Sequence, residues 1–251
     1  MLKIRVMPTL LYKDYGLVKG TGFDSWRRVG SLMQSIKVYN MREVDELVFV
    51  DIRATLDGRA PDYELVDDFA DECFMPLTVG GGIRTVEQVR RLLEVGADKV
   101  AINTAAIETP NLVRAVAEKF GSQCVVASID FKRRDGGCEV ATHSGTKPTG
   151  LDLVEHAKRC EALGAGEILL TSVERDGTMT GYDVEVTRRV SEAVKIPVIA
   201  SGGAGSYEHM AQVLTEGRAS AVAAAAIFHY TQQTPLEAKR HLHERGFRVR
   251  L

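Results

Sequence analysis

The fold is decided by the stretch Ile196-Pro-Val-Ile-Ala-Ser-Gly-Gly-Ala-Gly205, which predicts a buried strand, a glycine turn and the start of a helix. Val198 to Ala200 are apolar without alternation, as in a parallel strand that is buried on both faces. The glycines let a ligand approach the backbone amides, and Ser206 can cap the following helix, whose free N–H groups attract anions. The stretch therefore predicts a phosphate-binding loop.

An earlier stretch, Met75-Pro-Leu-Thr-Val-Gly-Gly-Gly-Ile-Arg84, repeats this pattern at an offset that aligns Gly82 with Gly203. The same offset aligns Asp45-Glu-Leu-Val-Phe49 with Gly166-Glu-Ile-Leu-Leu170. The chain is therefore expected to consist of two homologous halves, each with its own phosphate-binding loop.

Apolar runs and helical patterns alternate along the chain. A length of 251 residues is normal for a closed barrel of alternating strands and helices. No Pro/Ser-rich linker divides the sequence, so we predict one domain over residues 1–251, an α/β fold of the (β/α)8 TIM-barrel type with an internal two-fold repeat of half-barrels. Strands are expected at 3–10, 46–52, up to 80, 99–103, 124–130, 167–171, 198–200 and 219–225. Residues 12–30 are expected to form a loop that covers an active site, and 138–142 one arm of a hairpin.

The composition argues against several functional classes. With 32 basic and 34 acidic residues the net charge is −2, so no basic surface favours nucleic acid. The first residues lack the pattern of a secretory signal, and no apolar run approaches the length of a membrane span, so we expect a cytosolic protein. The four cysteines and six histidines are scattered without metal-ligand spacing, and neither a metal nor a cofactor is expected.

Strand residues alternate in direction, which allows a phase to be assigned to each strand. If Arg5 points into the barrel, so do Met7, Thr9 and Leu11. The same reasoning gathers two cations and two anions in the bottom layer of the barrel: Arg5, Glu46, Lys99 and Glu167. Burying four charges is costly unless they pair. Two interpretations follow, a structural salt-bridge ring that closes the base, or a gate for a small polar molecule.

At the opposite end, the same phase brings Asn103 and Thr171 inward, and Asp130 ends strand five at the face where barrel enzymes place their chemistry. A carboxylate there can act as a general acid or base. The alternative is that Asp130 pairs with Lys132 or caps a loop. Asp176-Gly177, after strand six, adds a second carboxylate, for which a solvated turn is the alternative.

The sequence resembles the cyclase subunits of imidazole glycerol phosphate synthase, from histidine biosynthesis. The resemblance covers nearly the whole chain and is carried by long motifs: Lys13-Asp14, Val18-Lys19-Gly20, Asp45 to Phe49, Thr78 to Ile83, Gly96 to Val100, Ile102 to Ala106, Phe120 to Gln123, Gly164 to Ser172, Arg175 to Thr178, Gly181-Tyr-Asp183 and Ala200 to Gly205.

The resemblance implies a two-fold symmetric barrel and a bisphosphorylated substrate. It also implies a glutaminase subunit, bound at the bottom of the barrel as a heterodimer, that passes ammonia through a gate formed by Arg5, Glu46, Lys99 and Glu167. Lys19 would lie on a mobile first loop. By the family pattern, substrate or phosphate binding falls on Lys19, Gly82, Asn103, Thr104, Thr171, Asp176, Gly177, Ser201, Gly203, Ala224 and Ala225.

The catalytic pair of the family consists of aspartates that end strands one and five. Asp130 matches the second, but the segment Thr9-Leu-Leu-Tyr-Lys-Asp-Tyr15 places Leu11 at the first. Leucine can neither accept nor donate a proton, and losing one acid/base group typically costs about 10²–10⁴-fold in rate. One implied function is therefore the family's lyase/cyclase reaction. The other is that of related chains that resemble ammonia suppliers for a sugar amidotransferase in surface-polysaccharide biosynthesis.

Overall fold

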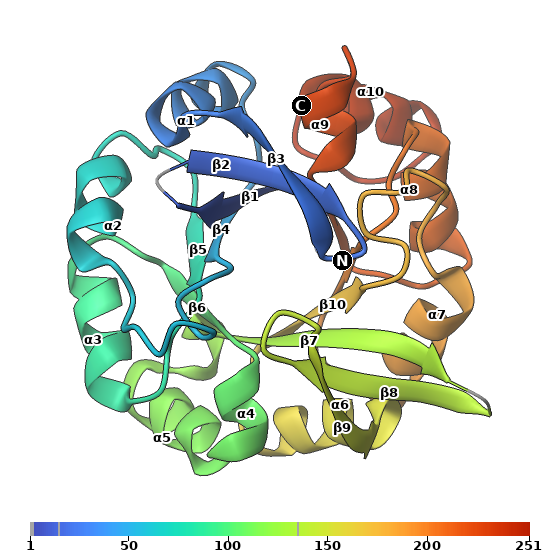
Figure 1. Cartoon of the computed structure of the whole chain (residues 1–251). Coiled ribbons are helices and arrows are strands. Elements are labelled where there is room, and N and C mark those ends of the chain that lie inside the picture. Colours follow the sequence, from blue (N-terminus) through green and yellow to red (C-terminus); the bar gives the residue numbers. More distant parts are fainter. Residues whose placement is uncertain (1–2, 15, 135) are drawn as a thin grey trace.

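The computed structural model describes residues 3–14, 16–134 and 136–251, and its central feature is a closed parallel barrel (Figure 1). Each barrel strand pairs in parallel with the next, and β7 pairs with β10, so the order β10-β11-β12-β1-β4-β5-β6-β7 closes on itself. The (β/α)8 prediction is confirmed. The barrel strands are β1 (Arg5–Lys13), β4 (Leu47–Asp51), β5 (Leu77–Gly80), β6 (Lys99–Ile102), β7 (Val125–Arg134), β10 (Glu167–Ser172), β11 (Val198–Ser201) and β12 (Ala221–Ala224).

Helices surround the barrel, as Figure 1 shows. Several begin at the caps that their sequences suggest: Thr85 and Gln88 form a capping box before α3, and Thr234 and Glu237 form another before α10. The helices are α1 (Leu32–Met41), α2 (Tyr63–Ala70), α3 (Val86–Glu94), α4 (Thr104–Glu108), α5 (Asn111–Phe120), α6 (Leu153–Ala162), α7 (Val184–Ala193), α8 (Tyr207–Thr215), α9 (Ala226–Tyr230) and α10 (Pro235–Glu244), with a 3-10 turn η1 (Ser122–Cys124). Among the described residues, no helix is long and apolar enough to cross a membrane.

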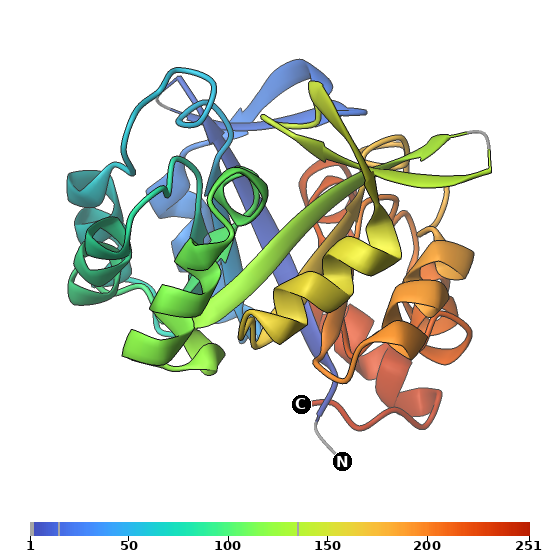
Figure 2. The ribbon, with the colours of Figure 1, turned by 90° about the horizontal axis from the view of Figure 1, so that it is seen from below.

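Two hairpins stand above the carboxyl ends of the barrel strands (Figure 2). The first consists of β2 (Gly16–Thr21) and β3 (Asp24–Gly30), and the second of β8 (Gly137–Thr142) and β9 (Lys147–Asp152). The loop expected over residues 12–30 is therefore wrong, because β1 continues to Lys13 and pairs antiparallel with β2. The hairpin arm expected at 138–142 is confirmed as β8. Tyr15 and Asp135, the latter part of the turn expected from the sequence, lie outside the described residues.

The core has two parts. The larger part lies between the strands and the surrounding helices. The smaller part fills the lumen of the barrel with the inward-facing side chains Met7, Val48, Ala101, Val126, Leu169, Ile199, Ala221 and Ala223. The expected phase of the strands is therefore correct: the lumen is narrow and apolar, with a charged layer below it and a pocket above it.

Candidate active site at the carboxyl ends of the barrel strands

A pocket with an empty volume of about 1170 Å³, open solvent at its mouth included, lies where the barrel strands end. Nearly all the residues expected to bind substrate contribute to its wall. From the first half these are Leu11, Gly82, Asn103 and Thr104, and from the second half Asp130, Thr171, Asp176, Gly177, Ser201, Gly203, Ala224 and Ala225. The fold thus brings together residues from both ends of the sequence, such as Leu11 and Ala225.

The two glycine loops lie in the pocket wall and need glycine for steric reasons. Gly82 has a φ of 73°, and a Cβ there would lie 2.7 Å from the carbonyl oxygen of Arg59. Gly203 has a φ of 108°, and a Cβ there would lie 2.2 Å from the carbonyl oxygen of Gly181. Beside the Gly82 loop the pocket wall contains Thr104, the first residue of α4. Beside the Gly203 loop it contains Ala225, which directly precedes α9. Backbone amides at both places suit one anionic group in each half.

Asp130 is the best candidate for proton transfer in the pocket. It lies in β7 opposite Thr171 of β10, is 7% exposed, and accepts a hydrogen bond of 2.8 Å from the Asn103 side-chain amide. Burial, followed by the charge of Asp176, raises the pKa of Asp130 to about 7, although the bond from Asn103 acts to lower it. A carboxyl group with this pKa can give or take a proton near neutral pH.

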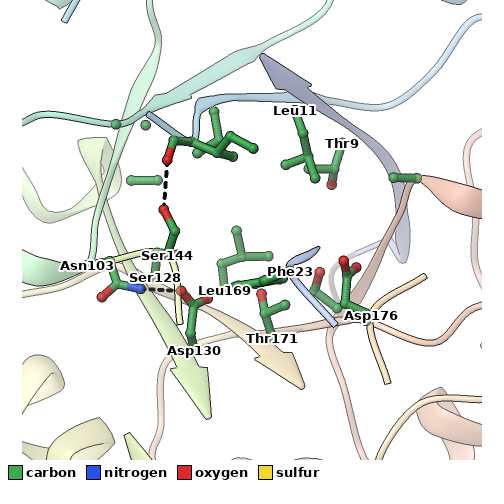
Figure 3. A pocket seen from close by; sticks show the side chains of 18 of the residues that line it. Thr9, Leu11, Phe23, Asn103, Ser128, Asp130, Ser144, Leu169, Thr171 and Asp176 are labelled. Carbon is green, nitrogen blue, oxygen red and sulfur yellow. Dashed lines mark hydrogen bonds between the residues drawn. The ribbon is translucent and has the colours of Figure 1, made fainter. Parts of the chain in front are cut away.

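Leu11 lies across the pocket from Asp130. In Figure 3, Leu11 and Thr9 of β1 occupy one side of the pocket, and Asp130 and Asn103 the opposite side. No carboxyl group therefore stands at the end of β1 where the family pattern expects one. Because a leucine side chain cannot exchange a proton, acid/base chemistry here depends on the carboxylates that line the pocket elsewhere, Asp130, Asp51 and Asp176, and on groups brought by the ligand.

Lys19 differs from the expectation of a mobile loop. It lies in β2, its side chain is 1% exposed, and its ammonium group donates a hydrogen bond to Asp176. The hairpin is further held by a bond of 2.8 Å from the Gly22 amide to the carbonyl of Asp176 and by one of 2.9 Å from the Tyr230 hydroxyl to the carbonyl of Lys19. Burial raises the pKa of Asp176, against the effect of Lys19. In this conformation Lys19 stands behind the pocket wall.

Several pocket residues were not expected from the sequence. Asp51 ends β4 and accepts bonds from the amides of Arg53 (2.9 Å) and Ala54 (3.0 Å). Asp51 could have been found, because it follows a buried strand just as Asp130 does. The hydroxyl of Ser144, between β8 and β9, donates to the carbonyl of Ile52 at 2.8 Å. Two aromatic side chains of the first hairpin, Phe23 and Trp26, also line the pocket without any signal in the sequence pattern.

The four charges expected at the base of the barrel form a closed ring. Arg5 reaches Glu46 at 2.7 Å and Glu167 at 2.6 Å. Lys99 reaches Glu46 at 3.0 Å and Glu167 at 2.9 Å, so anions and cations alternate. Burial acts to raise the pKa of Glu167, but the bonds and charges of Arg5 and Lys99 outweigh it and lower the pKa. The Thr78 hydroxyl donates a further hydrogen bond of 2.8 Å to the Glu46 carboxylate.

Comparison with protein families adds one finding. A family model described as histidine biosynthesis protein matches residues 5–234. The match begins at a residue of the charged ring, includes both glycine loops and Asp130, and ends immediately before α10.

Proposed function

We propose that this chain, which belongs to the histidine biosynthesis protein family, is the barrel subunit of a glutamine amidotransferase complex that resembles imidazole glycerol phosphate synthase. In such a complex a glutaminase subunit releases ammonia from glutamine, and the barrel takes the ammonia up at its base. One observation carries the proposal. A ring of alternating charges closes one end of an apolar lumen, and the other end of this lumen opens beside Asp130.

The ring has properties that suit a gate. Its side chains are only partly exposed, from 3% for Glu46 to 22% for Arg5, so they stand between solvent at the base and the lumen. Each of the four charges has two partners, so one contact of the ring can open and leave every charge paired. A permanent plug of apolar side chains would avoid the cost of desolvating charges. We therefore assign the ring of Arg5, Glu46, Lys99 and Glu167 to the admission of ammonia.

The surface around the base supports a partner at this end. Phe74, which precedes β5, is 82% exposed, and Met41, at the end of α1, is 77% exposed. Asn40 connects the two segments, since its side chain donates to the carbonyl of Glu72 at 2.5 Å and accepts from the amide of Phe74 at 3.2 Å. Large exposed apolar side chains in a fixed setting are typical of protein contact sites. We assign this surface to the glutaminase, in a heterodimer.

The pocket suits a bisphosphorylated substrate, because the two glycine loops lie in opposite halves of its wall. In the family's reaction, ammonia and a bisphosphorylated ribulosyl aminoimidazole carboxamide ribotide give imidazole glycerol phosphate and aminoimidazole carboxamide ribotide. Asp130 would supply the proton transfer that this lyase/cyclase chemistry requires. The phosphates would be held at the loop of Gly82, whose amide donates to the Thr55 hydroxyl at 3.2 Å, together with Thr104 in one half, and at Gly203 and Ala225 in the other.

A second candidate function is favoured by Leu11. With a leucine opposite Asp130, the pocket keeps its route for ammonia but lacks half of the expected acid/base pair. The chain would then deliver ammonia to a separate sugar amidotransferase that makes acetamidino sugars for bacterial surface polysaccharide. In that case a third protein would bind over the mouth of the pocket, where the two hairpins stand.

Turnover of the bisphosphate with ammonium salt, in the absence of any partner, distinguishes the two. We expect the cyclase function to give roughly 1 s⁻¹ or more in the natural chain. The ammonia-delivery function gives little turnover in the natural chain and a gain of about 100-fold or more in Leu11→Asp. Leu11→Asn is the matched control, because it has the shape of aspartate without the acid. Activity in none of the three chains would contradict the assignment of this substrate to the pocket.

A further inference from the structure

Two buried polar side-chain atoms without a hydrogen-bond partner face the pocket, among the residues that the structure describes. They are Oγ1 of Thr9 and Oδ1 of Asn103. The Asn103 side chain already uses its amide group on Asp130, at 2.8 Å, so only its carbonyl oxygen is free. The hydroxyl of Thr9 makes no bond at all. An unpaired buried hydroxyl destabilises a fold, and valine has the same shape without that cost.

Thr9 stands at the junction of the lumen and the pocket. Along β1 the inward-facing residues are Arg5 in the charged ring, Met7 in the apolar lumen, Thr9, and Leu11 in the pocket. At about 3.3 Å per residue, Thr9 lies roughly 13 Å along the strand from Arg5. Its backbone is held in the sheet, where Thr9 lies opposite Val48 of the neighbouring strand β4. The hydroxyl is thus kept at a fixed point of the proposed route.

A small polar molecule that crosses the lumen leaves its hydrogen bonds with water behind. The inward-facing residues of the lumen next to Thr9, such as Met7, Val48 and Ala223, offer it no polar side chain. Thr9 and Ser128 are the hydroxyl residues next above the lumen on β1 and β7, and of the two only the Thr9 hydroxyl is a buried group without a partner. Ammonia bound there would regain a hydrogen bond and would also satisfy Thr9. We infer that the Thr9 hydroxyl binds ammonia as it leaves the lumen, by donating a hydrogen bond to the nitrogen lone pair. This inference rests on the proposed function.

Binding can be observed at Thr9 directly, with ammonia itself as the probe. Threonine methyl groups are labelled with ¹³C, and ammonium chloride is added at a pH where part of it is neutral ammonia, with sodium chloride as the salt control. We expect a saturable shift of the Thr9 methyl signal. The reference signal is that of Thr187, a buried threonine of α7 whose hydroxyl already donates to the carbonyl of Asp183 at 2.7 Å. A Thr9 signal that moves no more than that of Thr187 would overturn the inference.

Delivery is measured in the reconstituted complex with glutaminase, [amide-¹⁵N]glutamine and excess unlabelled ammonium. Thr9→Val should lower the transfer of ¹⁵N about two- to tenfold, the net worth of one hydrogen bond. Thr9→Ser keeps the hydroxyl and should transfer better than Thr9→Val. Thr187→Val, far from the lumen, should transfer as the natural chain does. In urea, Thr9→Val should unfold at the same concentration as the natural chain or a higher one, which excludes misfolding as the cause.

The outcomes separate this inference from the proposed function. Full ¹⁵N transfer in Thr9→Val would refute the role of Thr9 and leave ammonia delivery standing. Equal losses in Thr9→Val and Thr9→Ser would also refute it, because the loss would then not follow the hydroxyl. Absence of ¹⁵N transfer in the natural complex would refute the proposed function, and the role of Thr9 with it.

Discussion

The titration of Asp130 should make the stability of the fold depend on pH in a direction that follows from its surroundings. Burial and the charge of Asp176 raise the pKa of Asp130 from 3.8 to about 7 in the folded chain. At a pH below 3.8 the group is protonated in both the folded and the unfolded chain and contributes nothing. Between 3.8 and about 7 only the unfolded chain loses the proton, so the free energy of unfolding falls as the pH rises. Above about 7 the loss is complete and constant.

The difference between 3.8 and about 7 corresponds to roughly 4 kcal/mol of folding stability. Asp130→Asn removes the titrating group and retains its shape, so the variant should lack this part of the pH dependence. Asn103→Leu removes the hydrogen bond that lowers the pKa of Asp130, which should move the end of the decline to higher pH.

The assay is urea denaturation of the natural chain and of Asp130→Asn over a pH series. The quantity to plot is the difference between their free energies of unfolding, because all other titrating groups are shared. We expect this difference to shift against the natural chain by several kcal/mol between about pH 4 and pH 7, then to stay level. A difference that is constant above about pH 5 would mean that Asp130 titrates like an ordinary aspartate, and would refute its assignment as a proton-transfer group.

Three further changes test other parts of the structure. Glu46→Gln should destabilise the chain in urea by about 3–5 kcal/mol, because two partly buried cations lose a shared partner; the exposed Glu155→Gln should cost less than about 1 kcal/mol. Gly177→Ala should lower the thermal midpoint more than Gly58→Ala. Both glycines have a positive φ, but only a Cβ at Gly177 would meet another atom, the carbonyl oxygen of Gly20 in β2, at 2.0 Å. Equal losses would contradict the close approach of the first hairpin. Phe74→Asp should weaken glutaminase binding tenfold or more, as measured by calorimetry. Leu56→Asp, after β4 at the opposite end of the barrel, should leave the affinity unchanged. An unchanged affinity in Phe74→Asp would contradict the assignment of this surface to the glutaminase.

Much of the barrel could be predicted because its signals are local. A continuous apolar run marks each buried parallel strand, and the alternation of side chains along a strand is a fixed geometric property. The phase that put Arg5, Glu46, Lys99 and Glu167 in one layer needed no knowledge of distant contacts. Gly82 and Gly203 could be recognised as well, because no other residue fits a positive φ with a carbonyl so close.

The first hairpin above the pocket could not be predicted in the same way. Strand β2 contains Gly16 and Gly20 and has no clear alternation, and its pairing with β1 and β3 is a tertiary property. The burial of Lys19 depends on a contact with Asp176, 157 residues away in sequence. The short helices α4 and α9 have five residues each, too few for a helical period to appear. The sequence therefore predicts the barrel, its ring and one arm of the second hairpin, but it does not predict the first hairpin over the pocket.

The source of the nitrogen that reaches the pocket tests passage of ammonia through the barrel most directly. The complex of barrel and glutaminase is given [amide-¹⁵N]glutamine, excess unlabelled ammonium and the bisphosphate, with the Leu11→Asp chain as reporter should the natural chain make no product. If ammonia passes through the barrel, the product nitrogen is enriched in ¹⁵N far above the surrounding ammonium, and this enrichment is lost in Lys99→Met, which opens the charged ring. Product with the same ¹⁵N content as the bulk ammonium would show that ammonia reaches the pocket from solvent, and would contradict passage through the barrel.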